Sequence, residues 1–333
     1  MPEGDRKAVA LRRPTDAGSR GPLSAAATWS RLLIAVTAVV AGAHLIGLPA
    51  LSAPAVVILA GAGLLAGLPH GGVDHLMAMR LAGRSLVPVV VVYAGLAGVA
   101  WFVLRWGGPA ALVAVIALSA LHFGLGELEF TSELTGWRPS ALPAAALVVA
   151  GSGAVLLPLA RSGEEFNRVA TAVSPGLARL IAAEPVRTAT LLVWLTAAVI
   201  AVTVALMSKH VSAAVDVVLI GLLGMMAPPL VAFAVWFGGW HAVRHCARML
   251  TLEPGCAALL REGRTRAAWR RLAGLAAPMS GAALLMVLAL GVFTAVAPDP
   301  AVILAEVLRL LLALTVPHMA IVWWLDRQRE RVG

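Results

Sequence analysis

The chain has 333 residues, of which 60% are hydrophobic and only 13% are charged. Soluble domains carry about 25% charged residues, so this composition excludes an ordinary soluble fold. The formal charge of +9 does not indicate a nucleic acid partner, because the basic residues stand in short loops and tails, a pattern that orients membrane proteins. Cys246 and Cys256 have no CxxC spacing and predict neither a disulfide framework nor a thiolate metal site.

Residues 1–28 are rich in Arg, Pro, Gly, Ser and Asp and have no apolar periodicity, which predicts a disordered cytoplasmic tail. A cleaved signal peptide is not expected, since the first apolar run is long enough to cross a membrane. Apolar runs of about 18 residues or more then recur, the length that crosses a bilayer. The predicted spans are 29–48, 51–78, 86–106, 109–126, 140–160, 190–208, 212–229, 230–250, 272–297 and 301–325.

We therefore predict an all-α fold, a polytopic transmembrane helical bundle of about ten spans. Residues 29–326 are expected to form one catalytic domain, and 327–333 a basic cytoplasmic tail. The count depends on a break at Pro228–Pro229, where two prolines interrupt helix hydrogen bonding. The segment 161–188 is predicted to be an external loop with a short interfacial helix.

Positive charge predicts the orientation of the chain. With ten spans, one side of the membrane receives most basic segments: residues 6–31, Arg80, Arg84, Lys209, 261–271 and 327–331. The loops near Pro49, Gly107 and Pro298 on the other side carry almost no positive charge. The positive-inside rule then places both termini in the cytoplasm and predicts a multi-pass protein of the inner (plasma) membrane.

Most of the eight histidines lie within predicted spans, where an ionisable side chain is costly and marks a functional candidate. Five fall in the middle or cytoplasmic half of inward-running spans: His70, His122, His241, His245 and His318. If these spans are neighbours, imidazoles from four helices meet at similar depth. The other three, His44, His75 and His210, are expected to be structural.

His241 and His245 form the most informative pair, in the sequence FGGWHAVRH. At i and i+4 they share one helix face, so both can reach a single ion. Together with His70 and His122 at matching depth, they predict a metal site. Imidazole binds Fe, Zn, Cu and Ni alike, so the ligand type alone does not choose the metal.

In GLPHGGVDH, Pro69 and three glycines are expected to kink the helix where His70 and Asp74 stand. Asp74 is interpreted in two ways: as a carboxylate that orients a ligand histidine, or as a helix-end charge paired with Arg80. In HFGLGELEF, Glu127 is interpreted as a simple interfacial charge in preference to a partner of a ligand.

His318, in TVPHM, follows a proline within a span. It is a candidate fifth ligand, a residue that supports a ligand, or a residue of the substrate pocket, and we favour the last two. An apolar membrane site suits a polyene or another lipid, and iron leaves coordination positions for dioxygen. Oxidation of an isoprenoid or lipid is the reaction that these residues favour.

Four motifs resemble the Brp/Blh family of membrane β-carotene 15,15'-dioxygenases: GLPHG, HFG, WHAVRH and TVPHM, in the family's order between residues 67 and 319. The resemblance implies that His70, His122, His241 and His245 are ligands of Fe(II). It also implies that the enzyme uses O₂ to split the central double bond of β-carotene into two retinal molecules. A rhodopsin that receives the retinal is a further implied partner, beside the lipid bilayer.

Other classes of membrane protein are also considered. An oxygenase acting on another carotenoid or isoprenoid remains an alternative. A di-iron desaturase needs about twice as many ligands in several histidine boxes, and the chain has one such box. A retinal-binding rhodopsin is excluded because the only lysines are Lys7 and Lys209. A transporter is the strongest non-enzyme alternative, although no internal repeat is visible.

Overall fold

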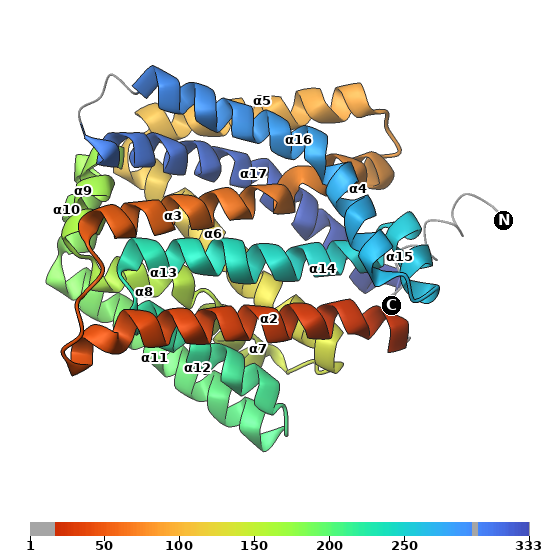
Figure 1. Cartoon of the computed structure of the whole chain (residues 1–333), viewed down its shortest axis with the longest axis horizontal. Coiled ribbons are helices and arrows are strands. Elements are labelled where there is room, and N and C mark those ends of the chain that lie inside the picture. Colours follow the sequence, from red (N-terminus) through yellow and green to blue (C-terminus); the bar gives the residue numbers. More distant parts are fainter. Residues whose placement is uncertain (1–16, 295–298, 333) are drawn as a thin grey trace.

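The structure, a computed structural model, describes residues 17–294 and 299–332, and within these ranges every regular element is a helix. The helices pack side by side in one bundle (Figure 1). In chain order the elements are α2 (Ala17–Gly42), η1 (Ala43–Ile46), α3 (Ala53–Gly67), η2 (Leu68–Val73), α4 (Asp74–Ala82), α5 (Leu86–Trp106), α6 (Gly108–Thr135), α7 (Ala141–Gly151), α8 (Gly153–Arg161), α9 (Glu164–Val173), α10 (Pro175–Ala182), α11 (Glu184–Met207), α12 (Val211–Met226), α13 (Pro229–Trp236), η3 (Phe237–His241), α14 (Ala242–Leu252), α15 (Pro254–Arg261), α16 (Thr265–Thr294) and α17 (Pro300–Val332).

The prediction of an all-helical bundle is confirmed. Among the described residues, seven helices are long and apolar enough to cross a membrane, and α7 with α8, bent by 54°, form an eighth candidate if they count as one span. The remaining two predicted spans correspond to shorter helices. α12, at the predicted span 212–229, has 16 residues. The predicted span 230–250 is divided into α13, with 8 residues, and α14, with 11. The count of about ten spans therefore stays a prediction.

The first helix begins earlier than predicted. α2 starts at Ala17, so the last twelve residues of the predicted tail, 17–28, are helical, while residues 1–16 lie outside the described part of the chain. Leu23, Ala26 and Ala27 are buried in one apolar cluster with Phe130 of α6 and Ala247 of α14. This tertiary contact extends the helix beyond the residue where the apolar periodicity begins. At the other end of the chain, α17 continues through the predicted basic tail to Val332.

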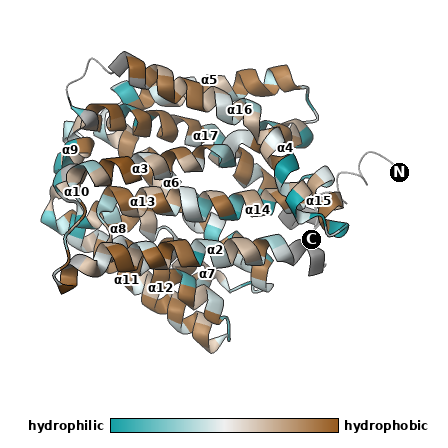
Figure 2. Cartoon of the chain, in the orientation of Figure 1, coloured by the Kyte–Doolittle hydropathy of each residue, from teal (hydrophilic) through white to brown (hydrophobic). Residues whose placement is uncertain are grey.

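The outward faces of the long helices are apolar. α5 exposes Val91, Val99 and Phe102, and α11 exposes Leu192 and Val199. Figure 2 shows the same pattern, with hydrophobic colour along the middle of the helices and more polar colour around α15 and α9. Exposed side chains of this kind, on helices long enough to span a bilayer, indicate contact with lipid.

The bundle has two distinct ends. The start of α2 and the end of α17 lie at one end, close to α15, whereas the short helices α9 and α10 lie at the other (Figure 1). The orientation of the chain, with both termini in the cytoplasm, stays a prediction. α9 and α10 occupy the segment predicted to be an external loop, and the break at Pro228–Pro229 separates α12 from α13 as expected.

α3 crosses α13 and η3 at backbone contact, and glycines make this possible. A Cβ atom on Gly63 would lie 2.6 Å from the backbone carbon and oxygen of Ala234, and one on Gly238 would lie 2.3 Å from the backbone oxygen of Gly63. Small residues allow such close approach between membrane helices. The crossing holds η3, which ends at His241, against α3, which leads directly into η2 and His70.

We predict that Gly63→Ala destabilises the protein, because the added methyl group must push two backbones apart, a strain that typically costs about 1–3 kcal/mol. Gly61→Ala is the matched control: a Cβ there meets no atom within 4 Å, and replacing glycine inside a helix stabilises it by about 0.5–1 kcal/mol. Thermal unfolding in detergent measures both. Equal midpoints for the two variants would contradict the backbone contact.

Candidate metal centre

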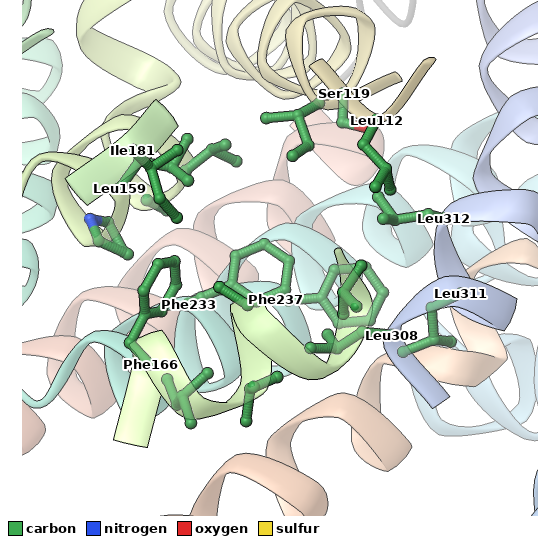
Figure 3. Close-up of a pocket in the computed structure, with 18 of the residues that line it drawn as sticks. Leu112, Ser119, Leu159, Phe166, Ile181, Phe233, Phe237, Leu308, Leu311 and Leu312 are labelled. Atoms are coloured by element: carbon green, nitrogen blue, oxygen red, sulfur yellow. The ribbon is translucent and has the colours of Figure 1, made fainter. Parts of the chain in front are cut away.

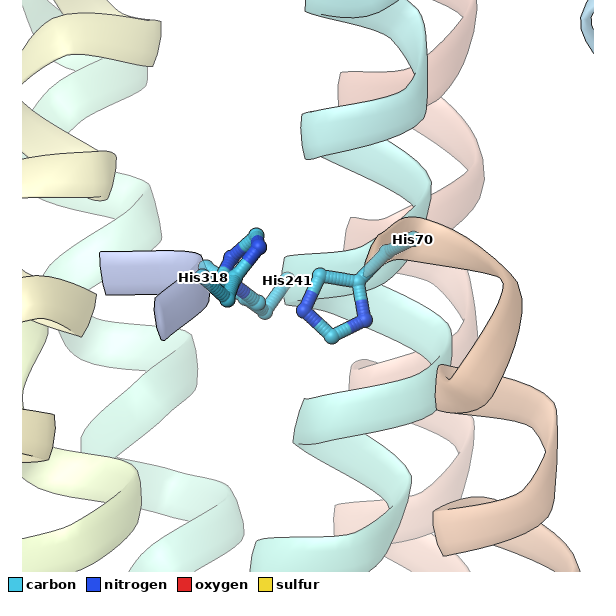
Figure 4. A group of neighbouring side chains, drawn as sticks. All are labelled: His70, His241 and His318. Atoms are coloured by element: carbon cyan, nitrogen blue, oxygen red, sulfur yellow. The ribbon is translucent and has the colours of Figure 1, made fainter. Parts of the chain in front are cut away.

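Five histidines from four parts of the chain converge inside the bundle. His70 comes from η2, His122 from α6, His241 and His245 from the η3–α14 segment, and His318 from α17, and all five are buried. The ring of His318 lies 4.7 Å from that of His70, 5.0 Å from that of His122 and 5.2 Å from that of His245, between centroids. The ring of His241 lies 5.3 Å from that of His70 and 5.4 Å from that of His122. Figure 4 shows His70, His241 and His318 facing one another across the gap between their helices.

Four nitrogen atoms of this cluster lack hydrogen-bond partners in the described part of the chain. The Nε2 atoms of His122, His241, His245 and His318 are buried and have no partner among the residues that the structure describes. His70 uses its Nδ1 atom in a 2.5 Å contact with the carbonyl oxygen of Gly67. A buried polar atom without a partner costs roughly 1–3 kcal/mol, so several in one place need an explanation. Nitrogen atoms of His70, His241 and His318 lie within 4.8 Å of one another, as the ligands of one metal ion do.

The helix that carries His70 changes its winding at this residue. η2 is a 3-10 segment between α3 and α4 and contains Pro69, as the GLPHGGVDH sequence predicts. The backbone of α16 packs directly on η2, because a Cβ atom on Gly72 would lie 2.8 Å from the carbonyl oxygen of Ala276. The tight turn and the missing side chain together place His70 deep in the bundle.

The helix that carries His241 and His245 also changes its winding. η3 is a π-helical turn over Phe237–His241, and single π turns inside helices are frequent at functional sites. After it, His241 and His245 share one face, with ring centroids 6.1 Å apart and planes at 23°. Trp236 stacks against His241 at 5.5 Å and Phe123 packs edge-on at 4.7 Å. These aromatic contacts restrict the orientation of the His241 ring.

Asp74 contacts His318 directly. Its Oδ2 atom lies 2.8 Å from His318 Nδ1 and 3.2 Å from the hydroxyl oxygen of Tyr93. A carboxylate on one ring nitrogen fixes the tautomer and directs the other nitrogen toward the cluster. The alternative pairing of Asp74 with Arg80 is wrong, because Arg80 binds Glu253 instead. The interpretation of Asp74 as an orienting carboxylate fits the geometry, although its partner is His318.

Glu127 is buried and does not act as an interfacial charge, which corrects the sequence interpretation. Its Oε2 atom lies 2.8 Å from Arg244 Nη1, and Arg244 also binds Asp216 of α12, at 3.1 and 3.2 Å, and Ser30 of α2. The guanidinium group stacks 3.4 Å from the ring centroid of Trp240. Arg244 therefore ties α14, just beside His241 and His245, to three neighbouring helices.

A second buried arginine on α14 adds to this anchor. Arg248 binds Glu133 of α6 at 3.0 Å and Asp326 of α17 at 2.7 Å. Sequence reasoning concentrated on histidines and missed both arginine networks. The available signal was a set of charges of opposite sign, the arginines and Asp216 within predicted spans and the other carboxylates beyond the ends of spans, since intramembrane charges pair with one another. Tyr93 was also missed, because a single tyrosine in an apolar helix carries no such signal.

Of the other three histidines, the structure describes the side chains of two. His210 precedes α12 and stacks on Trp137, with ring centroids 4.7 Å apart. His75, on α4, is half-buried and lines a cavity with His70 and His318. The side chain of His44 is outside the described part of the structure. The structural role predicted for His210 agrees with its stacking contact.

Two apolar cavities adjoin the cluster. The first has a volume of about 150 Å³ and is lined mainly by α6, α8, α9, α10, α13 and α17; Figure 3 shows Phe233, Phe237 and Leu308 among its walls. The second has a volume of about 600 Å³ and is lined by η2, α4, α5, η3, α16 and α17, including His70 and His318. Both are lined mostly by aliphatic and aromatic side chains, as sites for apolar ligands are.

The fold and the site define a helical membrane protein with a buried cluster of histidines of the kind that binds a transition metal. The family of β-carotene 15,15'-dioxygenases matches residues 62–326, and the chain belongs to this family. All five clustered histidines fall inside the matched range.

Two curated relatives are similar to the chain. A protein from Halobacterium salinarum, described as a probable β-carotene 15,15'-dioxygenase Blh, is 31% identical over 289 residues, which cover 78% of this chain and 81% of the relative. A β-carotene 15,15'-dioxygenase from an uncultured marine bacterium, 66A03, is 26% identical over 190 residues, or 54% of this chain and 64% of the relative. No solved structure matches the chain.

We predict that Arg244→Leu lowers stability by about 3–5 kcal/mol, because it leaves the buried carboxylate of Glu127 without its arginine. It also removes one of the two arginines, Arg244 and Arg31, that bind Asp216. The control is Arg168→Leu on α9, where the arginine side chain is 50% exposed and its partner Glu164 is 84% exposed. An exposed pair contributes less than about 1 kcal/mol. If the two variants unfold at the same temperature in detergent, Arg244 does not have the anchoring role described above.

Proposed function

We propose that this protein is an iron-dependent dioxygenase that cleaves the central 15,15' double bond of β-carotene with O₂. The double bond breaks, each of its carbons receives one oxygen atom, and two retinal molecules form. The observation that carries the proposal is the cluster of five buried imidazoles, with unpartnered nitrogens, beside two apolar cavities in a chain of this family.

His70, His122, His241 and His245 are proposed to hold Fe(II). The fit is supported by the buried Nε2 atoms of His122, His241 and His245, which have no partner in the described structure, and by the neutral imidazole chemistry that iron accepts. His318 adds a fifth imidazole at the same place, held by Asp74, so its position supports a direct contact with the metal more than a place in the pocket wall. Bound Fe(II) would supply the one-electron chemistry that lets O₂ react with a closed-shell polyene.

The protein's own residues have three tasks in this reaction. Asp74, with Tyr93 beside it, orients His318, and Trp236 and Phe123 restrict the His241 ring. The apolar cavity walls bind the polyene and exclude water from reactive intermediates. The exposed apolar helix faces allow the substrate to reach the site from the bilayer, where a carotenoid dissolves.

The cellular setting is part of the proposal. Both termini are placed in the cytoplasm by the positive-inside rule, with the protein in the inner (plasma) membrane. Retinal leaves the site as an apolar aldehyde that remains in the bilayer, where a rhodopsin can take it up. Ten membrane crossings, an even number, return the chain to the side on which it starts.

Retinal formation in membranes of a β-carotene-producing host tests the activity. We expect retinal with the wild-type protein and none with His241→Ala, because that variant removes an imidazole from the centre of the cluster. His210→Ala is the matched control, since His210 stacks on Trp137 outside the cluster. Chromatography of extracted retinoids and carotenoids, at equal expression, measures the result. Unchanged β-carotene with well-expressed wild type would favour another isoprenoid substrate or a transporter.

The role of Asp74 has a separate readout, the affinity of the purified protein for Fe(II). Removing the carboxylate partner of a metal-bound histidine typically costs about 10–100-fold in metal affinity, so we expect a loss of that size for Asp74→Asn. Glu262→Gln is the control, because Glu262 is exposed and pairs only with the exposed Arg264 in the described structure. Titration of metal-free protein with Fe(II) under anaerobic conditions gives both values. Wild-type affinity in Asp74→Asn would contradict a contact between His318 and iron.

A further inference from the structure

The two apolar cavities have a stretch of wall in common beside the histidine cluster. They share three lining residues, Phe237, Leu311 and Thr315. The ring of Phe237 lies 5.2 Å from that of His70, and Thr315 stands on α17 one turn before His318. We call this shared wall the junction; it lies next to residues of the candidate metal centre.

Each cavity extends away from this junction in its own set of helices. The first cavity is lined on one side by α9 and α10, through Phe166, Ala170 and Ile181. Phe123, which packs against His241, also lines it. The second extends between α5 and α16, past Gly98 and Met286. The cluster thus contacts both cavities: His70 and His318 line the second. Phe123 and Phe237 line the first, and they pack against His241 and His70.

This arrangement fits a long molecule that reacts at its centre. A polyene bound with its middle at Phe237 and His70 has one half available for each cavity. Only Ser119 and Thr315 contribute hydroxyl groups to the first cavity, so that half of the ligand must be apolar. The second cavity is larger, about 600 Å³ against about 150 Å³, so the first sets the stricter limit on the size of the half that it holds.

We propose that the two cavities are the two arms of one substrate site, joined at Phe237, Leu311 and Thr315, and that each arm holds one half of a symmetric C40 carotenoid. The length of the two arms then places the central double bond of the carotenoid at the histidines and determines which double bond is cleaved. This inference rests on the proposed function, because it takes its substrate class from that reaction.

Filling one arm at a time tests the proposal. A Cβ atom on Gly98 meets no atom within 4 Å, so Gly98→Phe places a ring into the second arm. The control is Gly95→Phe on the same helix, which has equally open space but does not line a cavity. Ala170→Phe fills the first arm, and its control is Thr171→Phe, at an exposed position of α9. Val173→Phe, also in the wall of the first arm, replaces Ala170→Phe if that variant does not fold.

Each variant is given two substrates: β-carotene, and a shortened apocarotenal that keeps one complete half and the central double bond. With either arm filled, we expect kcat/KM for β-carotene to fall about 100-fold, as displacement from the reactive position does. The shortened substrate can place its short end in the filled arm and should react nearly as in the wild type. Both control variants should cleave both substrates at wild-type rates.

Three results would overturn the two-armed site. The first is undiminished β-carotene cleavage with either arm filled. The second is an equal loss of activity on both substrates in a variant that keeps wild-type iron content and unfolding temperature. The third is an equal loss of activity in the control variants. Retained β-carotene, measured by absorbance after purification without iron or O₂, separates this proposal from the proposed function. If the wild type retains β-carotene but cleaves neither substrate, the reaction is wrong; a lower retained amount with either arm filled still supports the two arms.

Discussion

The pairing of Arg244 with Glu127 and Asp216 is the interaction on which the rest of the structure depends. A guanidinium group inside a lipid-embedded bundle is tolerated only when its charge and donors are satisfied, and here Ser30, Glu127 and Asp216 satisfy them from three different helices. The rotation of α14 about its axis is fixed by these contacts. Because His241 and His245 stand on the same helix, their rings are directed to the place where His70, His122 and His318 meet.

The buried histidines differ from the buried arginines in their hydrogen-bond partners. Arg244 and Arg248 bring their own carboxylate partners, whereas the Nε2 atoms of four histidines are buried with none in the described structure. The two ion-pair networks hold one helix in place but add little stability to the fold. The attraction within a buried ion pair seldom exceeds the free energy lost when its two charges are desolvated. Their value lies in geometry: a ligand set must be held to a fraction of an ångström before the metal binds. The Arg244 and Arg248 networks thus hold the histidines in position without being part of the cluster.

The irregularly wound helix segments also form walls of the cavities. The 3-10 turn at His70 and the π turn at His241 both interrupt helices inside the bundle, where backbone groups must be satisfied by protein. The two turns lie together because α3 crosses α13 and η3 without intervening side chains. Phe237, on the π turn, contacts His70 and forms a wall of both cavities. Two of the clustered histidines, His70 and His241, and parts of the cavity walls consequently come from the same two irregular turns, η2 and η3.

The sequence by itself determined the all-helical class, the apolar segments and the five histidines at one depth, because the length of an apolar run and the cost of an intramembrane imidazole are local properties. It also indicated the irregular helix around Pro69 and the i, i+4 pair at His241 and His245. Only the tertiary structure decided that Asp74 binds His318 and not Arg80, that Glu127 is buried beneath Arg244, and that α2 begins at Ala17. Each of these depends on which helices are neighbours and how each is rotated, and hydrophobic length and periodicity carry no information about either.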